Sequence, residues 1–198
     1  MPSLQYPLRF DFKISTLASD FSIKDNTGNS IAFVRQKIFK LKEDVVVFSN
    51  ESRSQELFRI KANKWLDFNT TYSITTKDGQ NIGKIARKGM RSIWKASYDI
   101  FDLNDQHLFT VQEANPWIKV LDAIANEIPV ISIFTGYLFN PKYLIKDNSG
   151  KIILELKKQP SFFGRRFLLD KVGSLDESQE GLVNLAIMMI VLLERYRG

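Results

Sequence analysis

The feature that most limits the possible folds is an apolar run near the end of the chain, Leu182 to Leu193, in which Asn184 is the only polar residue. A helix with this composition is apolar on every side and must therefore be surrounded. A bilayer or a protein can surround it, and length decides between them. The run has 12 residues, whereas a helix that crosses a membrane needs about 20. We therefore predict a buried helix over 176–197, capped by Ser174 or Asp176.

The residues before this helix show strand patterns separated by turns. Four segments share an aromatic residue, an isoleucine two positions later, an Asp-containing turn and a second apolar run, and we predict each to be a β-hairpin. These hairpins cover residues 21–37, 72–89, 98–114 and 143–159. Further strands are predicted at 44–48, 57–61, 91–101 and 165–171, and another near the N-terminus, where Phe10, Phe12 and Ile14 alternate with charged residues.

The strands and the apolar helix together predict one architecture. About a dozen antiparallel strands that close into a barrel leave no edge exposed, and the lumen of such a barrel is too wide for strand side chains to fill. A central helix fills that space. We therefore predict a single domain over residues 1–198. It is mainly β with helices, a closed antiparallel barrel of about 12 strands around the apolar C-terminal helix.

One segment interrupts the strand pattern. Asn115 and Pro116 resemble a helix start, apolar residues then recur at helical spacing, and an apolar stretch follows Pro129. Residues 117–139 are long enough to cross a bilayer, but they include charged and polar side chains. We expect this segment to pack across a mouth of the barrel.

Composition limits the compartment and the partners. The chain has no cysteine, which excludes disulfides and thiolate chemistry, and its first residues show no secretory signal. We expect a cytoplasmic protein, with peripheral contact to a membrane as a second location. The net charge of +6 and the pI near 9.4 favour an anionic membrane surface or a phosphorylated ligand as partner. The alternative is that the charge serves solubility.

Catalytic and cofactor motifs are missing from the sequence. With no cysteine and one histidine, His107, a Cys-His dyad is impossible, and there is no Gly-x-Ser-x-Gly motif. The sequence contains neither Gly-x-x-x-x-Gly-Lys-Ser/Thr nor Gly-x-Gly-x-x-Gly, the two Gly-rich motifs that bind nucleotide phosphates. His107 lies in a predicted turn, where we expect an exposed loop residue. We therefore expect no enzyme, no cofactor and no metal site.

Basic residues are scattered along the chain, and two groups of them are candidate ligand sites. The first is a predicted hairpin whose strands meet at Lys88-Gly89-Met90, so that cations on both strands cluster at its tip. Such a cluster can hold a phosphate, and we predict that it binds an anionic headgroup through Lys84, Arg87, Lys88, Arg91 and Lys95. The second is Arg165 and Arg166, which follow two phenylalanines and which we predict to contribute to headgroup binding at a membrane surface. The alternative for both places is a solvated surface.

The order of these elements resembles a known family. Hairpins such as YSITTKDGQNIGKIARK, the segment FNPKYLIKDNSGKIILELKK, the strand GRRFLLDK and the apolar final helix resemble the tubby-like fold, in its LURP-one-related and phospholipid-scramblase-like branch. The resemblance implies a 12-stranded barrel around a central helix and a group whose better-known members act at anionic membranes. The chain lacks the cysteine-rich segment and the calcium-loop pattern of the scramblase-like members. Calcium-driven scrambling is therefore not expected.

Three functions remain open from the sequence. The first is a non-catalytic barrel that binds an anionic lipid headgroup or another phosphorylated ligand. The second is a scaffold for protein interaction. The third is a carrier for a small apolar molecule, which requires a cavity beside the helix. Nucleic acid is a weaker fourth partner, because the aromatic residues fall at positions that face a strand core.

Overall fold

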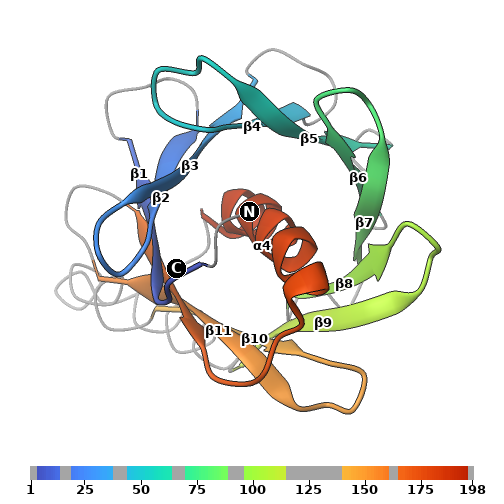
Figure 1. Cartoon of the computed structure of the whole chain (residues 1–198). Coiled ribbons are helices and arrows are strands. Elements are labelled where there is room, and N and C mark those ends of the chain that lie inside the picture. Colours follow the sequence, from blue (N-terminus) through green and yellow to red (C-terminus); the bar gives the residue numbers. More distant parts are fainter. Residues whose placement is uncertain are drawn as a thin grey trace, which may run out of the picture.

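Each strand of the sheet pairs with its neighbours in the sequence and the first strand pairs with the last, so the sheet closes into a barrel (Figure 1). The computed structural model describes residues 4–13, 19–37, 44–63, 70–88, 96–114, 140–160 and 165–195. Among these residues, twelve antiparallel strands surround one helix. The elements are β1 (Leu8–Phe12), β2 (Asp20–Lys24), β3 (Ser30–Gln36), β4 (Asp44–Phe48), β5 (Glu56–Ala62), β6 (Thr71–Thr76), β7 (Asn81–Arg87), β8 (Ser97–Asp102), β9 (His107–Glu113), β10 (Lys142–Lys146), β11 (Ile152–Gln159), β12 (Arg166–Lys171) and α4 (Glu177–Glu194).

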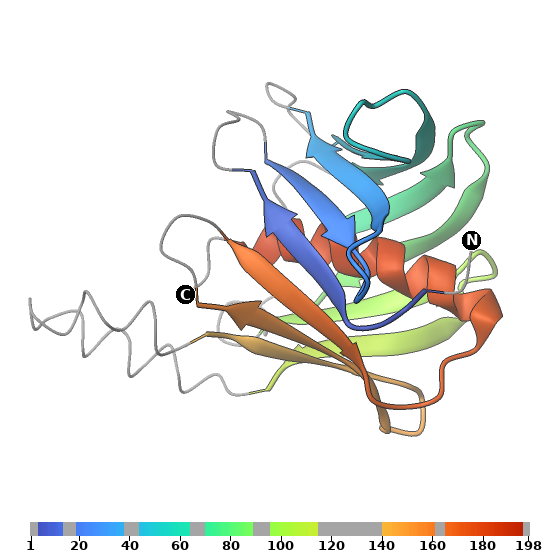
Figure 2. The ribbon, with the colours of Figure 1, turned by 60° about the vertical axis from the view of Figure 1, so that its left-hand side comes forward.

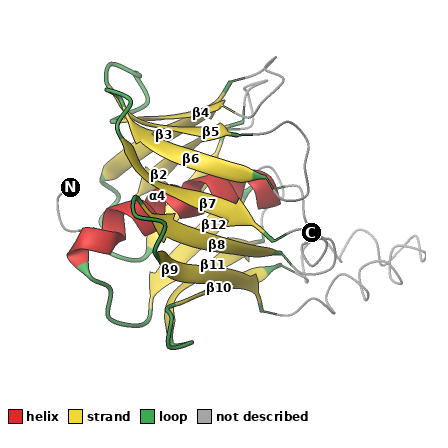
Figure 3. Ribbon diagram, turned by 90° about the vertical axis from the view of Figure 1, so that its right-hand side faces the viewer, coloured by secondary structure: helices red, strands yellow, loops and turns green. Residues whose placement is uncertain are grey.

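The helix α4 runs through the lumen of the barrel (Figures 2 and 3). Its residues from Leu182 to Leu192 are all buried, because the strands direct their apolar side chains at it from every side. Asp176 is the N-cap and accepts a hydrogen bond of 3.0 Å from the amide of Ser178. The predicted barrel, its central helix and one of the two predicted caps are thus confirmed. No helix among the described residues combines the length and apolar composition needed to cross a bilayer.

The four predicted hairpins share a structural device that explains their common pattern. In each one the strand register shifts directly after the shared isoleucine, which marks a β-bulge after Ile23, Ile74, Ile100 and Ile145. In three of them an aspartate then accepts backbone N–H groups two and four residues later, at Asp25, Asp102 and Asp147. The hydrogen bonds within these turns hold the pKa of Asp25 and Asp147 below its usual range, led by those from Thr27 and Ser149.

The pairing of β1 with β12 closes the barrel. Leu8 lies opposite Leu169 and Phe10 opposite Phe167, and all four side chains are buried. The predicted N-terminal strand is confirmed as β1 for its described part, since Phe10 and Phe12 face the lumen side. Ile14 lies outside the described residues.

The two ends of the barrel differ. The turns at 25–29, 49–55, 77–80, 103–106 and 147–151 lie at the end where α4 begins, which we call the mouth (Figure 3). The opposite end, where α4 finishes at Glu194, we call the base. The segment 117–139, expected to pack across a mouth of the barrel, lies outside the described residues, as do Arg91 and Lys95.

Candidate ligand site at the barrel mouth

Two of the predicted headgroup-binding lysines, Lys84 and Lys88, lie on the outer face of the barrel and are engaged by carboxylates. Lys84 Nζ lies 2.6 Å from an oxygen of Asp105, in the turn after β8, and 5.3 Å from the centre of the Phe101 ring. Lys88 Nζ lies 2.9 Å from an oxygen of Asp99 on β8. Both positive charges are therefore largely balanced by negative ones within the protein.

The strand register also separates the third described member of this group. Arg87 lies opposite Tyr98 and shares the inward-facing parity of Ile85, whereas Lys84 and Lys88 have the other parity. Because Arg87 pairs with Tyr98, the connection from β7 to β8 spans residues 88–96. The tight turn predicted at 88–90 would instead have placed Arg87 opposite a residue near position 91.

The second basic group lies on a different part of the barrel. β12, with Arg166 at its start, is separated from β7 by four intervening strands in one direction and by six in the other. Arg166 Nε lies 2.7 Å from an oxygen of Asp11, whose other oxygen lies 2.7 Å from Arg9 Nε. Arg165 precedes Arg166 and is exposed. The structure thus does not bring Arg165 and Arg166 together with the lysines of β7.

His107 takes part in a polar network instead of lying free in a turn. It is the first residue of β9, and its Nε2 lies 3.0 Å from the hydroxyl of Thr110 and 3.3 Å from a carboxylate oxygen of Asp99. Its Nδ1 contacts the side chain of Asn148. The expectation of an exposed loop residue was therefore wrong. Among the described residues, no group of three or more His, Asp or Glu side chains is placed to hold a metal ion.

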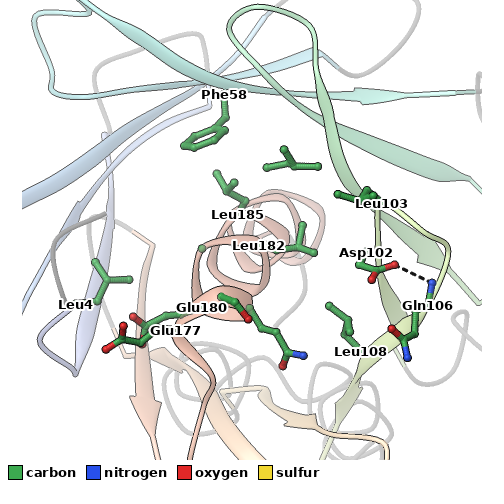
Figure 4. Close-up of a pocket in the computed structure, with 14 residues that line it drawn as sticks. Leu4, Phe58, Asp102, Leu103, Gln106, Leu108, Glu177, Glu180, Leu182 and Leu185 are labelled. Atoms are coloured by element: carbon green, nitrogen blue, oxygen red, sulfur yellow. Dashed lines mark hydrogen bonds between the residues drawn. The ribbon is translucent and has the colours of Figure 1, made fainter.

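A cavity of about 580 Å³ lies at the mouth, around the first turns of α4 (Figure 4). Figure 4 shows Leu182 and Leu185 on the helix, Phe58 directed towards them from β5, and Leu4 on the side opposite Leu103 and Leu108. The apolar part of the wall is formed by Leu4, Phe58, Ile82, Leu108, Leu182 and Leu185. Leu103, at the rim, is 61% exposed.

The position of α4 within the barrel determines the shape of this cavity. A side chain at Gly83 on β7 would collide with the carbonyl oxygen of Phe101 at 2.6 Å and with Leu182 at 2.8 Å, so the absence of one lets the helix approach this wall closely. At Gly181, one residue before Leu182, an added methyl group would meet no described atom within 4 Å. The helix is therefore packed tightly on β7 and leaves space beside Gly181.

Three of the six polar residues at the rim are acidic, and two of these three are held in place by hydrogen bonds or an ion pair. Asp102 accepts hydrogen bonds from the amides of Asn104 and Gln106, at 2.9 and 2.8 Å. Glu180 lies 3.0 Å from Lys171 Nζ, while Glu177 stands exposed in the first turn of the helix. Because these carboxylates line the opening, it is a poor entrance for an anion.

A second, smaller cavity of about 160 Å³ lies beside the helix, between α4 and the strands β1 to β5. Leu4 and Gly181 border both cavities. Apart from Ser30 and Asn184, the residues that line the smaller cavity are apolar or glycine. The hypothesis of a carrier for an apolar molecule required a cavity beside the helix, and this cavity lies there.

Sequence reasoning missed this site, although two signals were present. Leu103 is an apolar residue between Asp102 and Asn104 in a polar turn, and Gly181 stands in a helix where alanine would be more favourable. The fold alone requires neither an apolar residue in this turn nor a glycine in this helix. Both residues line the mouth cavity.

Comparisons with known proteins identify the family. The family model described as LURP-one-related matches residues 30–166, which is more than half of the chain. No curated protein and no solved structure matches the chain. The closed barrel of twelve described strands with a C-terminal helix fits the tubby-like fold that the sequence resembles. The chain therefore belongs to the LURP-one-related family.

Proposed function

We propose that this protein is a non-catalytic binding protein that holds a small apolar ligand at the mouth of its barrel. The observation that carries the proposal is the cavity of about 580 Å³ between α4 and the strands. Sites for small molecules commonly have volumes of about 300–1,000 Å³, with mainly apolar walls and a few polar groups. The mouth cavity has this size, and half of its fourteen lining residues are leucine, isoleucine or phenylalanine, beside six polar residues.

The ion pairs on the barrel surface favour this function over the binding of an anionic headgroup. Lys84, Lys88 and Arg166 each lie within 3.0 Å of a carboxylate oxygen. A phosphate would have to compete with those carboxylates, or displace them. An apolar ligand at the mouth needs no such displacement.

A fluorescence titration with the neutral apolar dye N-phenyl-1-naphthylamine tests the proposal. We expect saturable binding of one dye per protein. Gly181→Phe places a ring in the space beside the helix and should weaken binding at least about tenfold. Val172→Phe is the matched control, because Val172 is 53% exposed and lines neither cavity.

A second measurement avoids any dependence on the folding of the variant. Adding the dye to the unmodified protein should shift the NMR methyl signals of Leu4, Leu182 and Leu185 at the mouth. The methyl signals of Leu156, which is buried nearer the base, should stay unchanged. Dye binding that does not saturate, or that Gly181→Phe and Val172→Phe affect equally, would overturn the proposal.

A further inference from the structure

The opening of the mouth cavity carries carboxylates and no cations. None of the fourteen described residues that line this cavity is Lys, Arg or His, and three of them are the acids Asp102, Glu177 and Glu180. Glu180 is paired with Lys171 Nζ at 3.0 Å. In the part of the chain that the structure describes, no cation pairs with Asp102 or Glu177. The opening therefore keeps a net negative charge.

The start of α4 does not reverse this charge. Free amide N–H groups at the start of a helix attract anions. Here the amide of Ser178 donates to the side chain of Asp176, and the amides of Gln179 and Glu180 donate to its carbonyl oxygen, each at 3.0 Å. The remaining helix dipole equals about half a positive charge, which is less than the negative charge of Glu177 alone. A positively charged group therefore suits this opening best.

The smaller cavity is long and narrow. Gly181 and Met188 both line it, and they are about 10 Å apart along the axis of a helix. Its volume is only about 160 Å³, close to the roughly 150 Å³ of an apolar cavity that binds one benzene molecule. Apolar side chains such as Leu8, Phe10 and Ile23 form most of its wall. A single unbranched alkyl chain fits this space better than a fused ring system does.

Resting on the proposed function, we infer that the ligand is a single-chain amphiphile with a cationic head group. The alkyl tail lies beside α4 in the smaller cavity, and the head group stays at the opening of the mouth, near Asp102 and Glu177. The two cavities adjoin at Leu4 and Gly181, which line both of them. One chain can therefore occupy both spaces.

The surroundings of the opening favour a cationic head over an anionic or a neutral one. An anionic head would be repelled by the carboxylates and would meet no cation among the lining residues. A neutral head gains nothing from these charges. Because Glu177 is exposed, a cation beside it keeps most of its water and avoids the cost of burial. Exposed ion pairs contribute modestly, so the expected effect is a preference for the cation.

The test compares three compounds that share one chain length and differ in the charge of the head, octylammonium, 1-octanol and octanoate. Each is titrated at neutral pH and low salt against protein loaded with N-phenyl-1-naphthylamine. We expect octylammonium to bind about fivefold more tightly than 1-octanol, and octanoate to bind more weakly than the alcohol. Salt at about 0.5 M should reduce these differences, because it screens exposed charges.

A pair of variants assigns the preference to the opening. Glu177→Lys reverses one charge there, and we expect the ratio of the octylammonium affinity to the octanoate affinity to fall at least about fivefold. Asp78→Lys is the matched control, because Asp78 is exposed in a turn at the same end of the barrel and lines neither cavity. Its ratio should change much less. A general weakening of binding cancels in the ratio.

The position of the tail has a test that needs no variant. Met188 lines the smaller cavity, whereas the next residue, Met189, is buried and lines neither cavity. Octylammonium added to the unmodified protein should therefore shift the NMR methyl signal of Met188 and leave that of Met189 in place.

The outcomes separate this inference from the proposed function. If octylammonium binds no more tightly than 1-octanol, or if the two variants change the ratio equally, the cationic head is wrong. If bound octylammonium leaves the Met188 signal in place, or shifts both methionines equally, the tail position is wrong. In these cases saturable binding of the dye still supports the proposed function. If neither the dye nor any of the three compounds binds, the proposed function fails and the inference fails with it.

Discussion

The carboxylate of Glu194 accepts a hydrogen bond of 2.9 Å from the hydroxyl of Tyr143, inside the barrel and near its base. A second tyrosine, Tyr98, donates to the other oxygen of the same carboxylate. Glu194 is the last residue of α4, and the two tyrosines belong to β10 and β8 in this order. These bonds attach the end of the central helix to two walls of the barrel.

Tyr143→Phe removes one of these bonds and leaves an acceptor of Glu194 without its donor. We expect the free energy of unfolding to fall by about 1–3 kcal/mol, the typical cost for a buried group that loses its partner. Urea denaturation at neutral pH measures this. Val172→Phe, at an exposed site, is the control, and a Tyr143→Phe protein as stable as the unmodified one would contradict the expectation.

The same tyrosine should make stability depend on alkaline pH. Burial first, and then the negative charge of Glu194, raises the pKa of Tyr143. Burial likewise raises the pKa of Tyr6, although the hydrogen bond from Asn184 opposes it. An unfolded tyrosine ionises near pH 10. Since the folded state keeps the proton, the stabilisation is complete below about pH 10 and is lost as the pH rises further.

The measurement is urea denaturation between pH 8 and pH 11.5. Each such tyrosine contributes a loss of about 1.4 kcal/mol per pH unit above pH 10. The unmodified protein should therefore lose stability more steeply than Tyr143→Phe, and the difference between them should shrink above pH 10. Parallel pH profiles would show that Tyr143 does not contribute.

Gly83→Ala tests the close approach of α4 to β7. The new methyl group would lie 2.6 Å from the carbonyl oxygen of Phe101 and 2.8 Å from Leu182, and the residue has φ of +155°. Backbone cannot move aside as a flexible side chain can, so we expect a loss of about 1–3 kcal/mol in the free energy of unfolding. Thermal and urea denaturation measure it, and an unchanged midpoint would contradict the tight contact.

Gly181→Ala is the matched comparison, with the opposite expected sign. A methyl group there meets no described atom within 4 Å, and the residue lies in the first turns of a helix. Alanine is favoured over glycine in helices by up to about 1 kcal/mol. We therefore expect a gain in stability of at most this size. A loss would mean that the space beside Gly181 is smaller than the structure shows.

Binding to anionic membranes should be limited by the surface carboxylates. If Lys84 and Lys88 can hold headgroups, Asp99→Asn combined with Asp105→Asn should release them and increase binding to phosphatidylserine vesicles severalfold over phosphatidylcholine vesicles. Vesicle co-sedimentation at low salt measures this. Adding Lys84→Gln and Lys88→Gln to the double variant should reverse the gain. Equal binding by all three proteins would remove the two lysines from any headgroup site.

Periodicity predicted the fold because the relevant signals are local. The alternation in each hairpin and the all-round apolar composition of residues 182–193 depend on neighbours in the sequence. The closed sheet then follows, since twelve strands and an apolar rod have few other ways to bury their surfaces. The four hairpins have an isoleucine at the same place in their pattern, and in each of them a β-bulge directly follows it.

The site could not be predicted because it depends on register and on the helix position. Lys88 meets Asp99 through the pairing of β7 with β8, and Arg166 meets Asp11 through the pairing of β12 with β1. Neither pairing is visible in a count of basic residues. The cavities arise because α4 packs closely on Gly83 of β7 and leaves space beside its own residue Gly181. No sequence period encodes this difference.

The order of the elements along the chain has a consequence for biosynthesis. The sheet is completed when β12 pairs with β1, and α4, which fills the lumen, follows β12 in the sequence. As the polypeptide leaves the ribosome, the earlier strands therefore emerge before the element on which they pack. Their apolar faces stay open to solvent, or to chaperones, until α4 is released.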